Sequence, residues 1–497
     1  MTWLAHHLPI LQVVVPLVGA LLSALLRRGA TAWALALAVS WIMPAIAVAL
    51  MLQVLDSGPV SYHVGGWAPP WGIEYRVDLL SAFILVLVTT VGAAIMPFAR
   101  KSVAHEIDGD KQAWFYTMYL LCLTGLLGIT ITGDAFNIFV FLEISSLSTY
   151  VLIAMGKDRR ALLAAYQYLI VGTIGATFYV IGVGLLYLVT GTLNLVDIAA
   201  RLGPAAAETS RPVLAALAFL TVGISLKLAL FPLHVWLPGA YAHAPSVATA
   251  FLAGTATKVA VYALIRLFFS VFGVAISFQA LPVSEVLLTL SVAAMFIASI
   301  LAVFESDVKR VLAYSSLGQI GYITLGIGLA NVSGLTGGIV HLFNHALMKT
   351  ALFMALGAIV YRIGTIRLAD LAGIGRQMPL TMAVFVIGGL ALIGVPGTAG
   401  FVSKWYLAVG AFERGWWPLV FLILVTSLIA VVYVGRVVEV AWFREPSKFA
   451  ASAKDPPWSM LMPMMALAAA TIYFGIDTDA SAAIASRVAE SLIGGLK

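Results

Sequence analysis

A lysine and several prolines interrupt a stretch of sequence that is otherwise apolar. Residues 226–247 read LKLALFPLHVWLPGAYAHAPSV, in which Lys227 stands shortly before Pro232. A lysine at the centre of a membrane helix costs about 2.5–3.5 kcal/mol on insertion scales, and a proline leaves a carbonyl without its helical donor. Transporters tolerate both at broken helices, where protein or water covers them. We therefore expect Lys227 to face a packed or hydrated interior; the alternative is a lysine that snorkels from a helix end.

Four further charged side chains lie within apolar segments: Glu143, Lys258, Lys349 and Lys404. Together with Lys227 the segments thus contain four lysines. At about 3 kcal/mol each, their insertion into the membrane costs roughly 12 kcal/mol. That cost is comparable with the whole stability of many proteins, so it predicts a function for the group. Lys258 has a second interpretation of its own, since it could share a helix end with Arg266.

Glu143 is the one acid in the middle of an apolar segment, AFNIFVFLEISSLSTYVL, and it is the expected counter-ion for Lys227. Removal from water destabilises the ammonium form of a lysine, whereas a nearby carboxylate stabilises it. Movement of the carboxylate would therefore make the lysine hold or release its proton. Such a pair predicts a proton switch, and a purely structural salt bridge is the alternative.

Two histidines and a lysine recur every four residues in HLFNHALMKTALF. His341, His345 and Lys349 therefore lie on one helix face, about 6 Å apart along the axis. Titratable groups at that spacing can relay protons through intervening waters. Two other interpretations stay open: a metal site, for which no third ligand is evident, and histidines that are simply hydrogen-bonded in the core.

The composition indicates an all-α integral membrane protein. Of 497 residues, 62% are hydrophobic and 10% are charged, and the mean hydropathy is +1.03. The basic residues occur singly or in pairs, so no basic stripe points to nucleic acid. The single cysteine, Cys122, excludes an internal disulfide, and we interpret it as a core filler. No phosphate loop, dinucleotide fingerprint or nucleophile elbow appears, so we expect a transporter subunit without cofactor or metal rather than an enzyme.

Fourteen segments are long and apolar enough to span a bilayer. Two of them contain an internal break: 213–246 at Pro232, and 377–414 at Pro396. The others are 8–26, 31–54, 78–99, 113–132, 134–155, 162–190, 247–274, 280–304, 308–330, 334–360, 417–442 and 458–475.

The distribution of lysine and arginine predicts the orientation. Of these 28 residues, sixteen fall in loops on one side of the membrane, six fall inside segments and six fall on the N-terminal side. By the positive-inside rule the side with sixteen is cytoplasmic, so both termini lie outside, in a cell (inner) membrane. The six on the N-terminal side are Arg76, Arg201, Arg211, Arg414, Arg487 and Lys497.

An internal repeat is visible at an offset of 173 residues. GTLNLVDIA at 191–199 corresponds to GTIRLADLA at 364–372, and each copy precedes a proline-broken segment. The copies enter the membrane from opposite sides, which predicts two inverted five-helix repeats. The repeat is imperfect, because Lys227 precedes its proline whereas Lys404 follows Pro396. The predicted parts are an N-terminal part with helices 1–3, two repeats, and a last helix with its tail: 1–112, 113–274, 280–442 and 458–497.

Five of these motifs in combination resemble the proton-conducting membrane transporter family. They are FNIFVFLEI with Glu143, the Lys227 stretch, FLAGTATKVAVYALIR with Lys258, HLFNHALMKTALF, and ALIGVPGTAGFVSKWYL with Lys404. The resemblance covers about residues 75–445. The family comprises antiporter-like subunits of respiratory complex I, related membrane-bound hydrogenases and large subunits of Mrp-type cation/proton antiporters. Membership implies fourteen helices, inverted repeats and a proton path along a central polar axis.

Within the family the chain is most similar to the D subunit of Mrp-type Na⁺/H⁺ antiporters. The similarity lies in Lys404 within the second broken helix, in KDRRALLAAYQYLIVGTIGATFYVIGVGLLYLVTGTLNL and in the ending IYFGIDTDA. It implies that Glu143 and Lys227 form the switch of one half-channel and that Lys404 ends the other. The residues that would connect the two are Lys258, His341, His345 and Lys349.

The resulting expectation is a proton-translocating subunit of a multisubunit monovalent cation (Na⁺)/H⁺ antiporter in the lipid bilayer. Its implied partners are a second large antiporter-like subunit and several small membrane subunits. Three alternatives stay open. They are a proton-pumping subunit of a complex I-type NADH-quinone oxidoreductase or membrane-bound hydrogenase, a free-standing transporter for a small solute, and a structural subunit whose polar pairs are inert.

Overall fold

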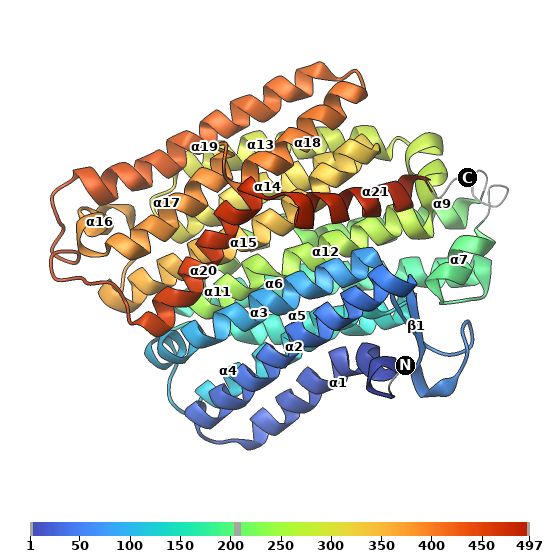
Figure 1. The fold of residues 1–497 in the computed structure, drawn as a ribbon, viewed down its shortest axis with the longest axis horizontal. Helices are drawn as coiled ribbons and strands as arrows, with labels where there is room; N and C mark the ends of the chain where they lie inside the picture. The colour runs from blue at the N-terminus through green and yellow to red at the C-terminus, as the bar shows by residue number, and fades with distance from the viewer. Residues whose placement is uncertain (1–2, 203–209, 495–497) are drawn as a thin grey trace.

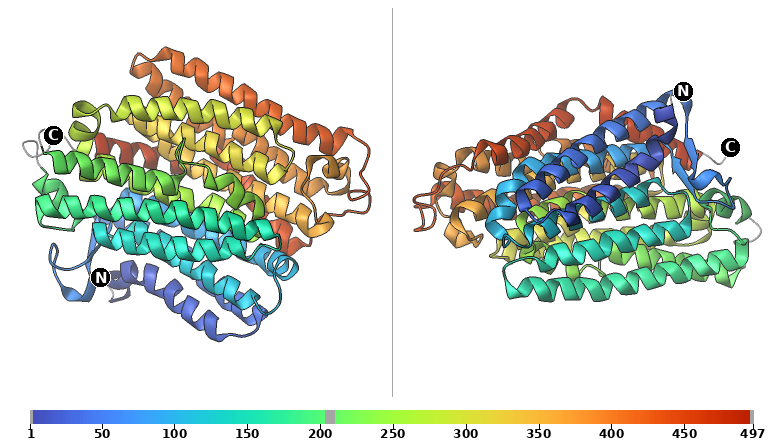
Figure 2. Two further views of the ribbon diagram at one scale, coloured as in Figure 1. Left: turned by 180° about the vertical axis from the view of Figure 1, so that it is seen from behind. Right: turned by 90° about the horizontal axis from the view of Figure 1, so that it is seen from below.

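The long helices of the chain lie side by side in an elongated bundle (Figure 1). The computed structural model describes residues 3–202 and 210–494, so Lys497 and the extreme ends of the predicted parts 1–112 and 458–497 lie outside it. The two ends of the described chain lie toward the same end of the bundle (Figure 1). Further views confirm that most helices run along one common direction (Figure 2).

A β-hairpin joins the second and third helices, although the sequence does not predict it. Its strands β1 (Val60–His63) and β2 (Glu74–Val77) pair antiparallel, with Val60 opposite Val77. The hairpin lies beyond the ends of the neighbouring helices, where the two strands satisfy each other's backbone groups. The helices of this part are α1 (Trp3–Leu25), α2 (Gly29–Ser57), the short η1 (Val64–Gly66) and α3 (Leu79–Glu106).

The region predicted as the first repeat begins with three unbroken helices and continues with shorter pieces. Its elements are α4 (Gln112–Ile131), α5 (Ala135–Ala154), α6 (Arg159–Thr190), α7 (Leu195–Arg201), α9 (Arg211–Leu228), α10 (Trp236–His243), α11 (Ser246–Gly254), α12 (Ala256–Ile265), η2 (Arg266–Val271) and η3 (Ala275–Ala280).

The region predicted as the second repeat has the same plan, and a final pair of helices follows it. Its elements are α13 (Val283–Phe304), α14 (Val308–Leu329), α15 (Val332–Ile363), η4 (Leu368–Leu371), α16 (Ile374–Gln377), α17 (Pro379–Ile393), α18 (Ala399–Glu413) and α19 (Trp417–Phe443). The final elements are α20 (Trp458–Ile476), η5 (Asp479–Ala483) and α21 (Ile484–Gly494).

Within the described residues, twelve helices are long and apolar enough to cross a membrane. The two other predicted spans have local reasons to fall short of that criterion. α14 is less apolar than the other spans, because Ser315, Ser316, Gln319 and several glycines lie among its apolar residues. α17 and α18 have 15 residues each, because the chain breaks between them. With these two, every one of the fourteen predicted segments is helical, and the all-α membrane fold is confirmed.

The offset of 173 residues reappears in the structure. α6 and α15 both have 32 residues, and both ends of α15 lie 173 positions after those of α6. Gly191 and Gly364 end these helices with left-handed φ angles of 68° and 72°. The same offset relates two isolated β-bridges, Asp134–Asn194 and Asp307–Arg367. These correspondences support the two repeats, whose boundaries as domains stay a prediction.

Both proline breaks are present, and each begins upstream of its proline. α9 stops before Pro232, and Ala229 takes a left-handed φ of 61°. α17 stops before Pro396, and Gly394 takes a left-handed φ of 88°. A left-handed residue is a common way to end a helix, and a proline cannot donate to the turn behind it. The two helices therefore end inside the bundle rather than at its surface.

The structure has two further breaks that the sequence does not predict. The predicted span 247–274 divides at Thr255, where φ is −127° and ψ is −59°. The last predicted span, 458–475, agrees with α20. Where the sequence predicts a tail, however, a further helix, α21, follows α20 across the bundle (Figure 1). Gly475 near the end of α20 packs against Gly397 and Thr398, so this break lies beside the one between α17 and α18. Neither break contains a proline. Each lies beside a glycine, Gly254 or Gly475, which alone is a weak sign of a helix end.

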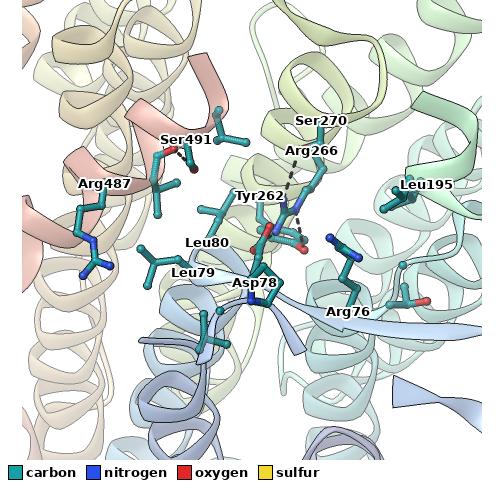
Figure 3. Close-up of a pocket in the computed structure, with 18 residues that line it drawn as sticks. Arg76, Asp78, Leu79, Leu80, Leu195, Tyr262, Arg266, Ser270, Arg487 and Ser491 are labelled. Atoms are coloured by element: carbon teal, nitrogen blue, oxygen red, sulfur yellow. Dashed lines mark hydrogen bonds and ion pairs between the residues drawn. The ribbon is translucent and has the colours of Figure 1, made fainter. Parts of the chain in front are cut away.

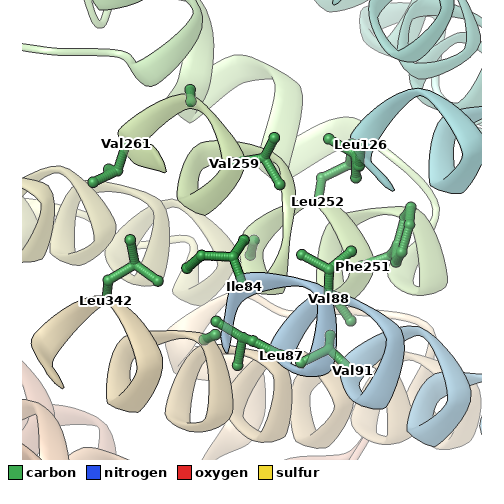
Figure 4. Close-up of a cluster of buried hydrophobic side chains, with 14 of the residues drawn as sticks. Ile84, Leu87, Val88, Val91, Leu126, Phe251, Leu252, Val259, Val261 and Leu342 are labelled. Carbon is green, nitrogen blue, oxygen red and sulfur yellow. The ribbon is translucent and has the colours of Figure 1, made fainter. Parts of the chain in front are cut away.

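The core is formed where α3, α11, α12 and α15 meet. Apolar side chains from these four helices gather there (Figure 4), and Cys122 is buried nearby with its Sγ 3.4 Å from Thr149 Oγ1. Every residue of α15 from 334 to 359 is buried. α15 is therefore surrounded by protein on all its faces, and it can carry polar groups that never meet lipid.

Candidate functional site: a buried polar axis

Lys227 lies in the last turn of α9, directly before the break, and its side chain is buried. Its Nζ is 3.8 Å from Oε1 of Glu143 on α5. It donates hydrogen bonds to Ser146 Oγ and, at 3.5 Å, to Tyr150 Oη. A separation of 3.8 Å is an ion pair without a hydrogen bond, and Oε1 of Glu143 has no hydrogen-bond partner among the described residues. The predicted pair is therefore present in a loose form, in which the lysine is shared between a carboxylate and two hydroxyls.

A cavity of about 20 Å³ adjoins Lys227, and a space of that size holds about one water molecule. Ser146 and Thr149 line it on the side of α5, and Ala256 and Val259 line it on the side of α12. The cavity thus leads from this lysine toward the first turn of α12.

Lys258 lies in that first turn, at the break after α11, and it is buried. Its Nζ donates to the carbonyl of Ala253 near the end of α11 and, at 3.3 Å, to Thr257 Oγ1. Carbonyls at the end of a helix carry partial negative charge, so the break supplies a counter-charge. Arg266 does not share this environment, because it pairs with Asp78 at the other end of α12.

His341 and His345 form successive steps on α15, with ring centroids 6.2 Å apart and ring planes 11° from parallel. His341 Nδ1 is 2.7 Å from Ser403 Oγ, and its Nε2 is 2.9 Å from Gln319 Oε1. Neither ring nitrogen of His345 has a hydrogen-bond partner among the described residues. Lys349, the next step, donates to the carbonyl of Leu312 at 2.8 Å. The predicted ladder is therefore present, and its middle member makes no hydrogen bond to the described chain.

Lys404 follows the second break in sequence, yet its side chain reaches back to the helix before the break. Its Nζ donates to the carbonyls of Leu392 and Ile393 at 3.0 and 2.9 Å, and to Ser427 Oγ at 2.8 Å. It also lies 4.5 Å from the centre of the Tyr322 ring, a favourable position for a cation.

Lys227, Lys258 and Lys404 share one structural position, because each lies at the carbonyl end of a helix that stops inside the bundle. The helices are α9, α11 and α17, respectively. In the sequence Lys227 precedes its proline whereas Lys404 follows Pro396, but in the structure both side chains lie near the end of the helix that stops before the proline. Helix ends of this kind stabilise cations at membrane depth.

Five of the predicted groups form one electrostatic cluster. His341 lies close enough to Lys258 and Lys404 to interact with their charges. His345 lies equally within reach of the charges of Lys258 and Lys349. Glu143 and Lys227 form a separate pair beside this cluster. Within residues 3–202 and 210–494 no three His, Cys, Asp or Glu side chains are grouped to hold a metal. The arrangement therefore suits proton transfer better than metal binding.

Lys309 is a buried charge that sequence reasoning misses. It lies in the first turn of α14, and its Nζ is 3.3 Å from the carbonyl of Ala244 just after α10. Lys349 binds the carbonyl of Leu312, one turn further along α14. Lys309 therefore lies between the ladder and the nearer end of the bundle. The adjacent Arg310 makes the position look like an ordinary charged loop, so no signal in the sequence separates the two.

The chain matches the family model described as NADH:quinone oxidoreductase/Mrp antiporter, TM, over residues 132–430. It is 41% identical to the N subunit of NADH-quinone oxidoreductase from Desulforudis audaxviator (strain MP104C), over 95% of this chain and 96% of that protein. It is 29% identical to the D subunit of the Na(+)/H(+) antiporter from Alkalihalophilus pseudofirmus, over 90% of this chain and 89% of that protein. It also superposes on a chain of the Mrp complex from Dietzia sp. DQ12-45-1b with a TM-score of 0.91 at 27% identity, covering 100% of this chain and 98% of that chain.

Proposed function

Because the chain belongs to the NADH:quinone oxidoreductase/Mrp antiporter transmembrane family, we propose that it is the proton-translocating subunit of a multisubunit Na⁺/H⁺ antiporter. The observation that carries the proposal is the buried polar axis. Titratable side chains follow one another through the centre of the bundle. Carbonyls at helix breaks hold Lys258 and Lys404 in place of carboxylates, and Lys349 binds a carbonyl within α14. A structural role alone would not require a buried group such as His345, whose ring nitrogens make no hydrogen bond to the described residues.

Glu143 and Lys227 would act as the switch of the axis. While the carboxylate stays near, it stabilises the ammonium form of Lys227. If α5 moves the carboxylate away, the buried ammonium loses that support, and its proton passes through the adjoining cavity toward α12 and Lys258. The long separation of 3.8 Å makes such a change small, because no hydrogen bond between the two side chains has to break.

His341 would pass the proton on by a change of hydrogen bonding at Ser403. The Ser403 hydroxyl has two acceptors in reach, the carbonyl of Gly400 at 3.0 Å and His341 Nδ1 at 2.7 Å. A hydroxyl has one proton to donate. When it donates to Gly400, both nitrogens of His341 can carry protons, since Gln319 Oε1 accepts from the other one. When it rotates to donate to Nδ1, His341 is neutral and its proton has moved on.

The partners of the chain are other membrane subunits. Its relatives include the D subunit of a Na(+)/H(+) antiporter, and its fold matches a chain of the Mrp complex. We propose that a second large antiporter-like subunit and several small ones complete the antiporter and that Na⁺ crosses through that assembly. We also propose that both termini face outside, so that Lys309 lies toward the cytoplasm and serves as the entrance to Lys349.

The test is to purify the tagged chain in mild detergent, identify its bound subunits and reconstitute the assembly in vesicles. An imposed sodium gradient is expected to drive proton movement, and the bound proteins are expected to be membrane subunits without redox centres. Sodium-independent behaviour of an assembly that is complete and monodisperse would contradict the proposal.

A second candidate is a proton-pumping subunit of a redox-driven complex. The observation that favours it is the 41% identity to the N subunit of an NADH-quinone oxidoreductase over nearly the whole chain. The same purification separates the two candidates. Bound subunits that contain flavin or iron–sulfur centres, together with proton movement driven by electron transfer, would establish the second one.

A further inference from the structure

A cavity of about 480 Å³ lies away from the polar axis, at the end of the bundle where the N-terminus lies. The end of α2, the start of α3, the end of α12 and α21 all contribute to its lining (Figure 3). Gly58 ends α2 and Asp78 caps α3 at this place. Because membrane-spanning helices end here, the cavity lies at the level of lipid headgroups rather than in the hydrocarbon layer.

Three arginines and one aspartate line the cavity. One of the arginines, Arg266, already has protein partners for its N–H donors. Arg266 pairs with Asp78 and donates to Tyr262 Oη at 3.1 Å and Ser81 Oγ at 2.9 Å. It also reaches Ser270 Oγ at 3.3 Å. Figure 3 shows this group in the middle of the lining. Arg266 and Asp78 therefore form a fixed, nearly neutral part of the wall.

The other two arginines have N–H donors to spare. Arg76 is 40% exposed, and its ion pair with Glu74, at 3.6 Å, is too long for a hydrogen bond. Arg487 on α21 is exposed and has no ion pair within the described residues. The two guanidinium groups come from distant parts of the chain, and they lie on opposite sides of Asp78 in Figure 3. The lining thus carries net positive charge.

The rest of the lining is apolar. It includes Val54, Leu79, Leu80, Val488 and Leu492. Guanidinium groups bind phosphate through paired N–H donors, and apolar side chains favour hydrocarbon. A ligand that satisfies both halves has a phosphate and an alkyl chain.

We propose that this cavity binds an anionic phospholipid, with Arg76 and Arg487 facing its phosphate-bearing headgroup from two sides and the apolar side chains along the acyl chains. The lipid joins α21 to the β2–α3 segment, since each arginine belongs to one of these parts. It therefore holds the C-terminal helix in place beside α3 and α15. This inference concerns a site outside the polar axis and is independent of the transport proposal.

The test compares the assembled complex with an Arg76→Gln/Arg487→Gln double variant after delipidation and addition of phosphatidylglycerol, phosphatidylcholine or inorganic phosphate. Lipid retention is measured by native mass spectrometry, and exposure of α21 is measured by hydrogen exchange. Arg211→Gln is the matched control, because Arg211 is an exposed arginine at the start of α9 and does not line the cavity.

The wild type and the control should retain phosphatidylglycerol, which should also slow exchange in α21. The double variant should lose about tenfold in retention, the scale of two solvent-exposed charge contacts, and the lipid should no longer slow hydrogen exchange in its α21. Phosphatidylcholine should protect α21 far less. Equal retention of phosphatidylglycerol by the double variant would overturn the site. Full protection of α21 by inorganic phosphate alone would overturn the assignment to a lipid.

Discussion

Lys227 has a carboxylate 3.8 Å away, whereas Lys258 and Lys404 are held by the carbonyl ends of helices. A carboxylate on a separate helix can move relative to its lysine, but a carbonyl at the break is part of the same local backbone. The pair of Glu143 and Lys227 is therefore the part of the axis best suited to control, and the other lysines are better suited to conduct.

Replacement of Glu143 by Gln is expected to reduce transport by about tenfold or more. The variant removes the charge that stabilises the ammonium group of Lys227, and about 1.4 kcal/mol of such stabilisation corresponds to a factor of ten. The amide keeps the shape of the side chain. Proton movement in vesicles that contain the assembled complex measures the effect. Glu439→Gln is the control, because Glu439 pairs with Arg444 in an exposed ion pair. Unaltered transport in Glu143→Gln would exclude this pair as the switch.

Ser403→Ala tests the hydroxyl that faces His341. The variant leaves Nδ1 of His341 without its partner at 2.7 Å and removes the rotation between two acceptors. We expect slower proton movement at unchanged assembly, by about tenfold for the loss of one buried hydrogen bond at 1.4 kcal/mol. Ser481→Ala, in the buried turn between α20 and α21, provides a comparison at a site outside the axis. Equal slowing in both variants would indicate a general packing effect instead.

The sequence predicts the residues of the axis because a charge in an apolar segment is visible without any structure. Lys258 and Lys349 are found in this way, and both are buried. The burial of Lys309 is not predicted, because Lys309 lies at the start of a helix beside Arg310. A charged residue at such a position is normally exposed to water, so it draws no attention in the sequence. The partners of Lys258 and Lys404 also cannot be predicted, since they are backbone carbonyls that only the helix breaks bring into reach.

At the scale of helices and their breaks, proline residues predict two of the four interruptions. Pro232 and Pro396 indicate the ends of α9 and α17, because proline cannot continue a helix. The break at Thr255 contains no proline. The hairpin of β1 and β2 is also not predicted, because its strands have only four residues each.

The left-handed residues that end α9 and α17 give a prediction about stability. Ala229 holds a φ of 61°, which is unfavourable for a residue with a Cβ, so Ala229→Gly is expected to stabilise the protein by about 1 kcal/mol. Gly394→Ala should destabilise it by about 1–2 kcal/mol, because φ is 88° and the new Cβ would lie 2.9 Å from Lys404 Cδ. Thermal unfolding in detergent measures both changes. Gly435→Ala adds a Cβ inside α19 that meets nothing within 4 Å, so it should raise the midpoint slightly, because alanine favours a helix interior. A fall of the midpoint there as large as that of Gly394→Ala would discount the comparison.

At the scale of the whole molecule, the two ends of the described chain lie toward the same end of the bundle (Figure 1). The excess of lysine and arginine on the opposite side predicts that this end faces outside. The bundle also brings the two repeat regions together: Lys309 of the second donates to the carbonyl of Ala244 of the first at 3.3 Å, and α15 beside them is buried from residue 334 to 359.

The orientation can be tested with single cysteines in a Cys122→Ala background. Trp71→Cys lies at an exposed position in the hairpin, and Lys111→Cys lies at an exposed position before α4. A membrane-impermeant maleimide added to intact cells is expected to label the first variant and to reach the second only after permeabilisation. The reverse pattern would invert the orientation and place Lys309 outside.

Proton movement through the buried ladder on α15 is the step on which the proposed function depends, and His345→Leu interrupts that ladder at its middle member. Neither nitrogen of His345 binds another described residue, so a leucine of similar size breaks no hydrogen bond to those residues and should leave folding and assembly intact. Sodium-driven proton movement in vesicles is then measured beside the wild type. We predict an assembled complex whose transport falls by at least about tenfold, the scale on which one positioned acid–base group contributes. An assembled complex that transports at the wild-type rate would show that protons do not use the ladder.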